Sequence, residues 1–265
     1  MSRSVFISGA ARGIGRSTAL HLARRGWTVG VYDILDDFGW ITTENLGPGT
    51  IHHGYLDVTD PESWTKALED FTSHTGGRLD ALVNNAGVLH GGPFVEGGSY
   101  EKDSALVDVN VKGVFNGARA AYPYLKATPD STLLNLASAS AIYGTPDLAV
   151  YSASKFAVRG LTEALNVEWE PEGIKVRALW PLFVKTNLLD DFSATSTKRL
   201  GVRLKADDVA KAAADMVERE RGKIAKVHQP VGLPAKVLYG LSQVCPSWMV
   251  RFGNGILTTN RKLKI

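Results

Sequence analysis

Residues 4–15 read SVFIS-GAARGIG, a short apolar run followed by three closely spaced glycines. The run Ser4–Ser8 is typical of a buried β-strand, and Gly13–Arg25 carries apolar residues at helical spacing. Glycines at a strand-to-helix junction let the backbone approach a phosphate group, and the free N–H groups of the helix attract its negative charge. The stretch therefore predicts a β-α unit, whose glycines serve either a pyrophosphate site or close packing alone.

The rest of the chain alternates short β-branched runs with longer amphipathic stretches. Further strands are expected at Thr28–Tyr32, Thr50–Leu56, Asp80–Asn84, Thr132–Ser138, Ile174–Trp180 and Lys223–His228. Further helices are expected at Pro61–Thr72, Ser104–Lys126, Val150–Glu170 and Lys205–Arg219. This alternation predicts the α/β class, a single doubly wound Rossmann-like domain whose seven-stranded, mainly parallel sheet has helices on both faces. Residues 1–229 form that domain, and residues 230–265 form a C-terminal extension packed on it.

Composition excludes several classes of function. The net charge of the 265 residues is only +3, and no basic cluster predicts nucleic-acid binding. No apolar stretch reaches the roughly 18 residues of a membrane span. Cys245 is the only cysteine, which excludes an intrachain disulfide and favours the reducing cytoplasm. The six histidines show no metal-ligand spacing, so no metal site is predicted.

One acidic residue and one short polar run extend the candidate phosphate site. Asp33 ends the second expected strand, where a carboxylate accepts hydrogen bonds from the adenosine ribose and repels a 2′-phosphate. This favours NAD over NADP, although Arg12 could contact a 2′-phosphate and Asp33 could simply be a solvated strand end. The run Asn84-Asn85-Ala86-Gly87 follows the fourth strand at the same sheet edge. Its small residues would admit a flat ring, as an ordinary turn would also permit.

Tyr151 and Lys155 are four residues apart and therefore lie on one face of an expected helix. Reduction of a ketone needs a proton donor near neutral pH, whereas a free tyrosine has a pKa of about 10. A cation about 4 Å away lowers that pKa by roughly 3 units, towards 7. Ser138 ends the preceding strand and could hold the substrate oxygen against Tyr151. The sequence thus predicts interconversion of a small secondary alcohol and a ketone, with the hydride carried by a nicotinamide coenzyme.

Taken in this order, the motifs resemble the short-chain dehydrogenase/reductase family in its common short form, over about residues 4–228. The resemblance implies an NAD(P)-dependent oxidoreductase with the catalytic set Asn110, Ser138, Tyr151 and Lys155, in which Asn110 anchors a water of the proton relay. It also implies that Asp57 and Val58 hold the adenine and that Val184 and Thr186 contact the carboxamide. The full predicted coenzyme set is Gly9, Arg12, Gly13, Ile14, Gly15, Asp33, Asp57, Val58, Asn84, Ala86, Gly87, Tyr151, Lys155, Pro181, Val184 and Thr186.

The chain departs from the family at Leu182, because members usually have glycine after the proline at position 181. A leucine there adds bulk beside the nicotinamide and the substrate. The substrate pocket is expected at Leu89, Ile142 and the segment Asn187–Leu204, together with the candidate substrate residues Ser140, Tyr143, Leu148, Leu182 and Leu188. These apolar residues favour an apolar substrate, with simple packing as the alternative.

The C-terminal extension carries Leu233, Val237, Leu238 and Leu241 at helical spacing. They predict packing over the core or a subunit contact, with a pocket cover or a membrane-surface helix as alternatives. In the family the two long helices commonly carry subunit contacts, so the resemblance implies a homodimer or homotetramer. The alternative function is a non-catalytic NAD-binding regulatory protein on the same fold, which would not need an acid and its activating cation. An epimerase or dehydratase would usually need a larger substrate domain.

Overall fold

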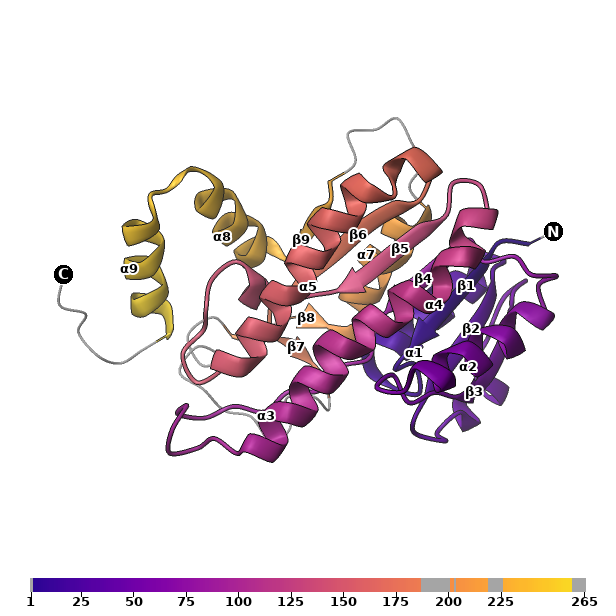
Figure 1. Ribbon diagram of the computed structural model, residues 1–265, viewed down its shortest axis with the longest axis horizontal. Helices are drawn as coiled ribbons and strands as arrows, with labels where there is room; N and C mark the ends of the chain where they lie inside the picture. Colours follow the sequence, from indigo (N-terminus) through magenta and orange to yellow (C-terminus); the bar gives the residue numbers. More distant parts are fainter. Residues whose placement is uncertain (1, 187–200, 203, 219–225, 259–265) are drawn as a thin grey trace.

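The structure is a computed structural model that describes residues 2–186, 201–202, 204–218 and 226–258. Seven parallel strands form one sheet in the order β3-β2-β1-β4-β5-β6-β9 (Figure 1). They span Ser4–Ser8 (β1), Thr28–Asp33 (β2), Thr50–Tyr55 (β3), Ala81–Asn84 (β4), Thr132–Leu136 (β5), Lys175–Pro181 (β6) and His228–Val231 (β9). The predicted doubly wound Rossmann-like class is confirmed.

Helices cover both faces of the sheet (Figure 1). They span Gly13–Arg24 (α1), Pro61–Ser73 (α2), Tyr100–Val107 (α3), Gly113–Ala127 (α4), Ala149–Glu168 (α5), Ala206–Glu218 (α7), Leu233–Val244 (α8) and Ser247–Thr258 (α9). Short helical turns lie at Gly39–Thr42, Ala139–Ala141 and Glu170–Glu172, and two short strands pair at Val184–Lys185 (β7) and Leu204–Lys205 (β8). At α2, Asp60 caps the first turn by accepting a hydrogen bond from Glu62 N, and Pro61 takes the first helical position.

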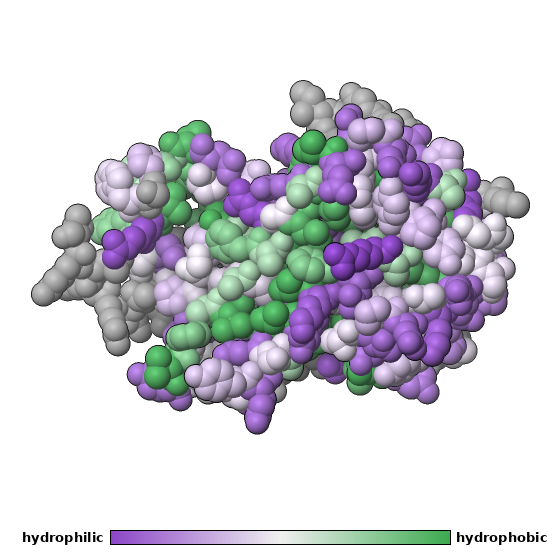
Figure 2. Space-filling model, viewed as in Figure 1, coloured by the Kyte–Doolittle hydropathy of each residue, from purple (hydrophilic) through white to green (hydrophobic). Residues whose placement is uncertain are grey.

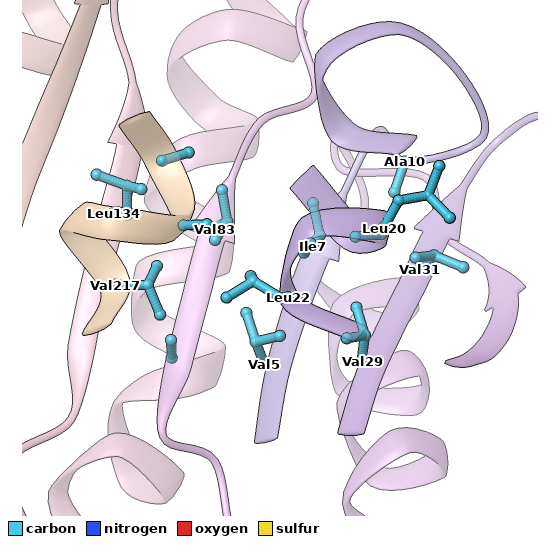
Figure 3. Close-up of a cluster of buried hydrophobic side chains, with 14 of the residues drawn as sticks. Val5, Ile7, Ala10, Leu20, Leu22, Val29, Val31, Val83, Leu134 and Val217 are labelled. Carbon is cyan, nitrogen blue, oxygen red and sulfur yellow. The ribbon is translucent and has the colours of Figure 1, made fainter. Parts of the chain in front are cut away.

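The core has two halves because successive strand side chains point to opposite faces. Val5 and Ile7 of β1 pack with α1 and α7, as Figure 3 shows for Leu20, Leu22 and Val217. Phe6 points the other way, into a cluster with Trp64 and Phe71 of α2. The apolar run that opens the chain is therefore buried on both sides, as expected for an inner parallel strand.

The helix predicted at Ser104–Lys126 begins earlier and is not uniform. It starts at Tyr100, because the Ser99 side chain accepts a hydrogen bond from Lys102 N and caps the first turn. A wider π-helical turn, Asp108–Lys112, interrupts it between α3 and α4. Such turns are common at functional sites, and this one contains Asn110.

The seventh strand lies at His228–Val231, not at Lys223–His228 as predicted. Its pairing with β6 joins Trp180 to Pro230 and Pro181 to Val231. A proline lacks the N–H that an inner strand needs, and Pro230 lies within this strand. As an edge strand, β9 pairs on one side only and tolerates proline there. The sheet therefore includes the first two residues of the predicted extension.

The extension forms two helices, α8 and α9, at the end of the molecule opposite β3 (Figure 1). Leu238 of the predicted stripe packs against the domain. The other three stripe residues, Leu233, Val237 and Leu241, are exposed, so only Leu238 of the stripe packs over the core, and the predicted alternatives of a subunit contact or a membrane-surface helix stay open for the rest. Across the described ranges, we find no helix with both the length and the apolar character needed to cross a bilayer.

Candidate active site

The loops that follow β1 and β4 meet at the carboxyl ends of these two neighbouring strands. The strand order of the sheet reverses at this point. Gly9 has φ +65°, and a Cβ there would lie 2.6 Å from Ala86 Cα. Asn85 Nδ2 donates to Ser8 O at 2.9 Å and to Gly9 O at 2.7 Å. Because a side chain at Gly9 would separate these backbones, the two loops are built to close on each other. Ligands of open α/β sheets bind at this kind of position.

Beside this junction lies a cavity of about 310 Å³. Gly13 has φ +61°, and the nearest atom to a Cβ there would be Thr186 Cγ2 at 3.8 Å. The lack of a side chain at Gly13 therefore leaves open space in the cavity. Asn85 and Val88 also line the cavity. The predicted coenzyme residues on its wall are Gly9, Arg12, Gly13, Ile14, Asp33, Asp57, Val58, Ala86, Gly87 and Thr186. A dinucleotide fits this donor set, since backbone amides, small residues and two carboxylates share one trough.

The two carboxylates are held by their own loops. Asp33 accepts from Ala11 N at 3.0 Å through one oxygen and from Leu35 N at 3.1 Å through the other. Asp57 accepts from Thr59 N at 2.9 Å and from Thr59 Oγ1 at 2.7 Å, both through Oδ1. Both side chains line the trough. Asp33 thus ties the glycine turn to the end of β2 and leaves a fixed negative charge on the rim.

A second cavity of about 100 Å³ continues from the trough, and Ile14, Asn85, Gly87, Val88 and Thr186 line both. Its wall comes from the carboxyl ends of β5 and β6 and from the first turns of α5. Predicted catalytic, coenzyme and substrate residues meet here: Ser138, Tyr151, Lys155, Pro181, Val184, Leu89, Ser140, Tyr143 and Leu182. Hydroxyl groups and an ammonium therefore face an otherwise apolar space.

The electrostatics of Tyr151 and Lys155 differ from expectation. Burial raises the pKa of Tyr151 to about 12, and a hydrogen bond with Ser138 offsets this only in part. Burial lowers the pKa of Lys155 to about 8. Lys155 Nζ donates to Leu136 O at 3.0 Å and lies 5.6 Å from the centroid of the Tyr151 ring. Burial thus holds the pKa of Tyr151 above its ordinary value of 10, in the direction opposite to the predicted fall towards 7.

Asn110 is fully buried in the π-helical turn and faces the loop after β4. Its Oδ1 accepts from Val88 N and its Nδ2 donates to Val88 O, both at 2.9 Å. Gly87 lies between the two predicted catalytic groups, since a Cβ there would be 3.2 Å from Asn110 Oδ1 and 3.8 Å from Lys155 Nζ. Asn110 therefore positions the loop that forms the floor shared by both cavities.

Four other predicted residues lie away from the cavity walls. Gly15 is buried under the turn, where a Cβ would be 2.4 Å from Gly9 O. Asn84 continues the buried pattern of β4 and donates to Asn135 Oδ1 at 3.0 Å. Leu148 packs in one cluster with Leu106 and Tyr151. Ile142 belongs to a core cluster next to the pocket, and Leu188 and the segment 187–200 lie outside the described residues.

Sequence reasoning also missed residues that shape the site. Asn85, the neighbour of Asn84, holds the glycine turn, and its position one residue past the strand end was the available signal. Trp40 donates from Nε1 to Ala11 O at 3.0 Å and braces the turn from the loop after β2. Phe183 and Thr145 complete the smaller cavity. Among the described residues, no three histidine, cysteine or acidic side chains gather as metal ligands would.

Comparison with known proteins agrees with this geometry. The family model described as short chain dehydrogenase matches residues 3–197. The chain belongs to this family. Members are NAD(P)-dependent oxidoreductases, and the reaction class of the present short-chain dehydrogenase follows from that membership.

Two curated relatives and one solved structure are similar to this chain over most of its length. The 3-alpha-(or 20-beta)-hydroxysteroid dehydrogenase of Mycobacterium tuberculosis is 36% identical over 190 residues, which cover 72% of each chain. The cyclopentanol dehydrogenase of Comamonas testosteroni is 35% identical over 184 residues, covering 69% of this chain and 73% of that one. The crystal structure of a 3-ketoacyl-(acyl-carrier-protein) reductase from Brucella melitensis complexed with NADH superposes with a TM-score of 0.78 at 31% identity, covering 86% and 96% of the two chains.

Proposed function

We propose that this short-chain dehydrogenase interconverts an apolar secondary alcohol and its ketone, with Tyr151 as the proton-transferring group and NAD(H) as the coenzyme. One observation carries the proposal. Ser138, Tyr151 and Lys155 line a small apolar cavity that opens into the trough of the glycine turn. A coenzyme lying in the trough would give or take up the hydride beside the alcohol carbon.

Ser138, Tyr151 and Lys155 each have a distinct task in this proposal. Ser138 holds the substrate oxygen by a hydrogen bond and thereby orients it towards Tyr151. In the reducing direction, the Tyr151 hydroxyl gives its proton to the ketone oxygen, and in the oxidising direction the phenolate takes it back. The Lys155 ammonium stabilises that phenolate. Because burial alone holds the pKa of Tyr151 near 12, the positive charges that gather around it in the loaded site must supply the lowering that catalysis needs.

The preference for NAD is inferred from Asp33. Its carboxylate stands on the trough wall with both oxygens engaged by backbone N–H groups of the flanking loops. A 2′-phosphate beside it would meet an uncompensated negative charge, whereas ribose hydroxyls would donate to it. Arg12 also lines the trough but sits at its exposed side. The fixed carboxylate therefore favours NAD over NADP.

A cyclic aliphatic alcohol or a hydroxysteroid is the substrate class that we infer. Leu89, Leu182 and Phe183 give the cavity an apolar wall, and the described residues that line it include no aspartate or glutamate. Two of the relatives above are named for cyclic secondary alcohols, cyclopentanol and hydroxysteroids. Leu182 narrows the space beside Pro181, which favours a flat or small ring over a branched one.

The experiment is a coenzyme absorbance assay with cyclopentanol, cyclohexanol, a 3-hydroxysteroid and an acetoacetyl thioester, each with NAD and with NADP. We expect turnover of a cyclic alcohol with NAD and its loss in Tyr151→Phe. Turnover of the thioester alone would replace the substrate class by that of a ketoacyl reductase. Coenzyme binding measured by calorimetry, without turnover of any substrate, would instead support a regulatory NAD-binding protein.

We also propose that two or more copies associate in the cytoplasm through α4 and α5. Figure 2 shows a band of apolar residues over α5, and its exposed stripe consists of Phe156, Gly160, Ala164 and Val167. This one-sided spacing of apolar residues on an exposed helix is typical of a subunit contact. Val167→Arg should reduce the mass measured by light scattering, whereas Val95→Arg, a change at another exposed valine, should not. An unchanged mass in Val167→Arg would contradict this arrangement.

A further inference from the structure

The helices α8 and α9 each expose apolar residues that the site and the proposed subunit contact do not use. On each helix, exposed apolar residues recur every three or four positions and thus share one side. They include Val237, Leu241 and Val244 on α8 and Trp248, Phe252 and Ile256 on α9. Figure 2 shows apolar residues near the end of α8, at one extremity of the molecule. A monomeric soluble protein rarely leaves so many large apolar side chains together in water.

The opposite sides of the two helices are fixed to the domain. Leu238, Tyr239 and Val250 pack into a cluster with Tyr143 and Trp180, next to the wall of the substrate cavity. Asn254 Nδ2 donates to Gly144 O at 2.7 Å and ties α9 to the loop before α5. The exposed apolar side is therefore the outward face of a docked helix pair, and none of the described residues packs over it.

The charge of this region is one-sided. Residues 221–265 contain eight lysines and arginines and no aspartate or glutamate. Lys236 of α8 and Arg251 of α9 are exposed beside the apolar stripes. Apolar side chains flanked by bases, with an exposed tryptophan among them, fit the boundary between anionic headgroups and acyl chains. A second copy of the same face would instead bring bases against bases with no acid between them.

We propose that the outward face of α8 and α9 docks the enzyme on an anionic lipid surface, with the two helices lying in the plane of the membrane. The apolar stripes enter the boundary of the acyl chains, and Lys236 and Arg251 meet the lipid phosphates. The short-chain dehydrogenase is then a peripheral enzyme whose substrate cavity lies next to the bilayer. The proposal is independent of which alcohol the site accepts.

The test is co-sedimentation of the full chain with vesicles of phosphatidylcholine and phosphatidylglycerol in a two-to-one ratio, and with vesicles of phosphatidylcholine alone. We expect the protein to sediment with the anionic vesicles and to be released as salt screens the headgroups. Leu241→Gln with Trp248→Gln should weaken this binding by about tenfold, because it removes buried apolar area. Lys236→Glu with Arg251→Glu should weaken it by at least about tenfold, since each base near the surface contributes to the attraction.

Matched controls change the same chemistry elsewhere. Val95→Gln with Tyr100→Gln removes two exposed apolar side chains before and at the start of α3. Lys66→Glu with Lys211→Glu makes the same charge change on the exposed sides of α2 and α7. Both controls should sediment like the wild type. All variants should keep the circular dichroism and thermal midpoint of the wild type, because every changed residue is exposed.

Three outcomes would overturn the proposal. Wild-type protein that stays in the supernatant with anionic vesicles would exclude lipid docking. Equal binding by the α8–α9 variants and their controls would place the contact elsewhere. Loss of oligomer mass in Leu241→Gln with Trp248→Gln, measured by light scattering without lipid, would show that a second copy covers the face.

Discussion

The Lys155 ammonium lies over the ring of Tyr151, 5.6 Å from its centroid, and donates its hydrogen bond to Leu136 O. The same pair carries opposite pKa shifts with one cause, since burial raises the pKa of the phenol to about 12 and lowers that of the ammonium to about 8. The two groups are thus held close, but they are not charged at the same pH. Where Lys155 carries its positive charge, Tyr151 is neutral, and where Tyr151 would be a phenolate, Lys155 is neutral. This relationship makes separate predictions for chemistry and for stability.

Replacing Tyr151 by phenylalanine should lower kcat by roughly 10²–10⁴-fold, because a positioned acid or base contributes about that factor. Coenzyme affinity and thermal midpoint should change little, since only one hydroxyl is lost. Tyr143→Phe is the matched control, because Tyr143 lines the same cavity and burial also raises its pKa to about 12. Steady-state kinetics decide the matter. Equal losses in the two variants would contradict the assignment of Tyr151 as the proton-transferring group.

Lys155→Met should change how stability depends on pH. The folded-state pKa of about 8 lies below the ordinary value of 10.5, so the folded protein binds fewer protons than the unfolded chain between these values. Stability of the wild type therefore rises with pH across that window, and the buried charge costs most below it. Relative to Lys155→Met, the free energy of unfolding of the wild type should rise by about 3 kcal/mol from pH 7 to above pH 10.5.

Urea unfolding at several pH values measures this difference. Lys66→Met removes an exposed lysine of α2 and serves as the control, for which the difference from the wild type should not vary with pH. If Lys155→Met and the wild type keep a constant separation over the whole range, the ammonium is not buried as the structure places it.

Much of the fold followed from patterns that depend on local spacing alone. The run Ser4–Ser8 and the glycines after it fixed the first strand and its junction, and Asp60-Pro61 marked the start of α2. The seventh strand was misplaced because Pro230 is unfavourable in any strand except an edge, and edge position depends on the order of the whole sheet. The π-helical turn at Asp108–Lys112 has no periodicity of its own in the sequence, so no local pattern predicts it.

The site was predictable as a set of residues but not in its orientations. Neighbouring residues at a strand end point in opposite directions, so of two consecutive asparagines, Asn85 supports the turn while Asn84 is buried against Asn135. The pKa of Tyr151 was misjudged because a four-residue spacing indicates how close Lys155 lies to Tyr151. It does not indicate how deeply the two side chains are buried. The exposure of Val237 and Leu241 also depends on which side of α8 meets the domain.

Asp33→Ser should shift coenzyme choice towards NADP. Removing a charge a few ångströms from a 2′-phosphate changes their interaction by about 1–3 kcal/mol, which is roughly a tenfold to hundredfold change in the NADP-to-NAD affinity ratio. Calorimetric titration of both coenzymes measures the ratio without requiring a substrate. Asp36→Ser makes the same charge change at an exposed position that does not line the trough. An equal shift in that control would mean that net charge, not the Asp33 site, sets the preference.

Gly9→Ala and Gly13→Ala should separate packing from ligand space. Both glycines have φ near +60°, which costs an L-residue about 1–2 kcal/mol. Gly9→Ala also drives a Cβ to within 2.6 Å of Ala86 Cα, so it should lower the thermal midpoint more than Gly13→Ala. The new methyl group of Gly13→Ala has room in the protein but enters the trough. This variant should therefore lose much of its coenzyme affinity while its thermal midpoint falls only slightly. Equal midpoints for the two variants would contradict this ordering.

Leu182→Ala should widen the substrate preference. The side chain is half-buried on the cavity wall beside Pro181, and removing its methyl groups opens space where a larger ring would stand. Discrimination by a few methylene groups is worth roughly 10–200-fold in kcat/KM, so the ratio of kcat/KM for a bulky cyclic ketone to that for cyclopentanone should rise by about tenfold or more. Leu238→Ala is the control, because Leu238 packs in the same cluster but does not line the cavity. Its ratio should match the wild type. A rise in both variants would mean that loosened packing, and not the volume at position 182, controls which ring the site admits.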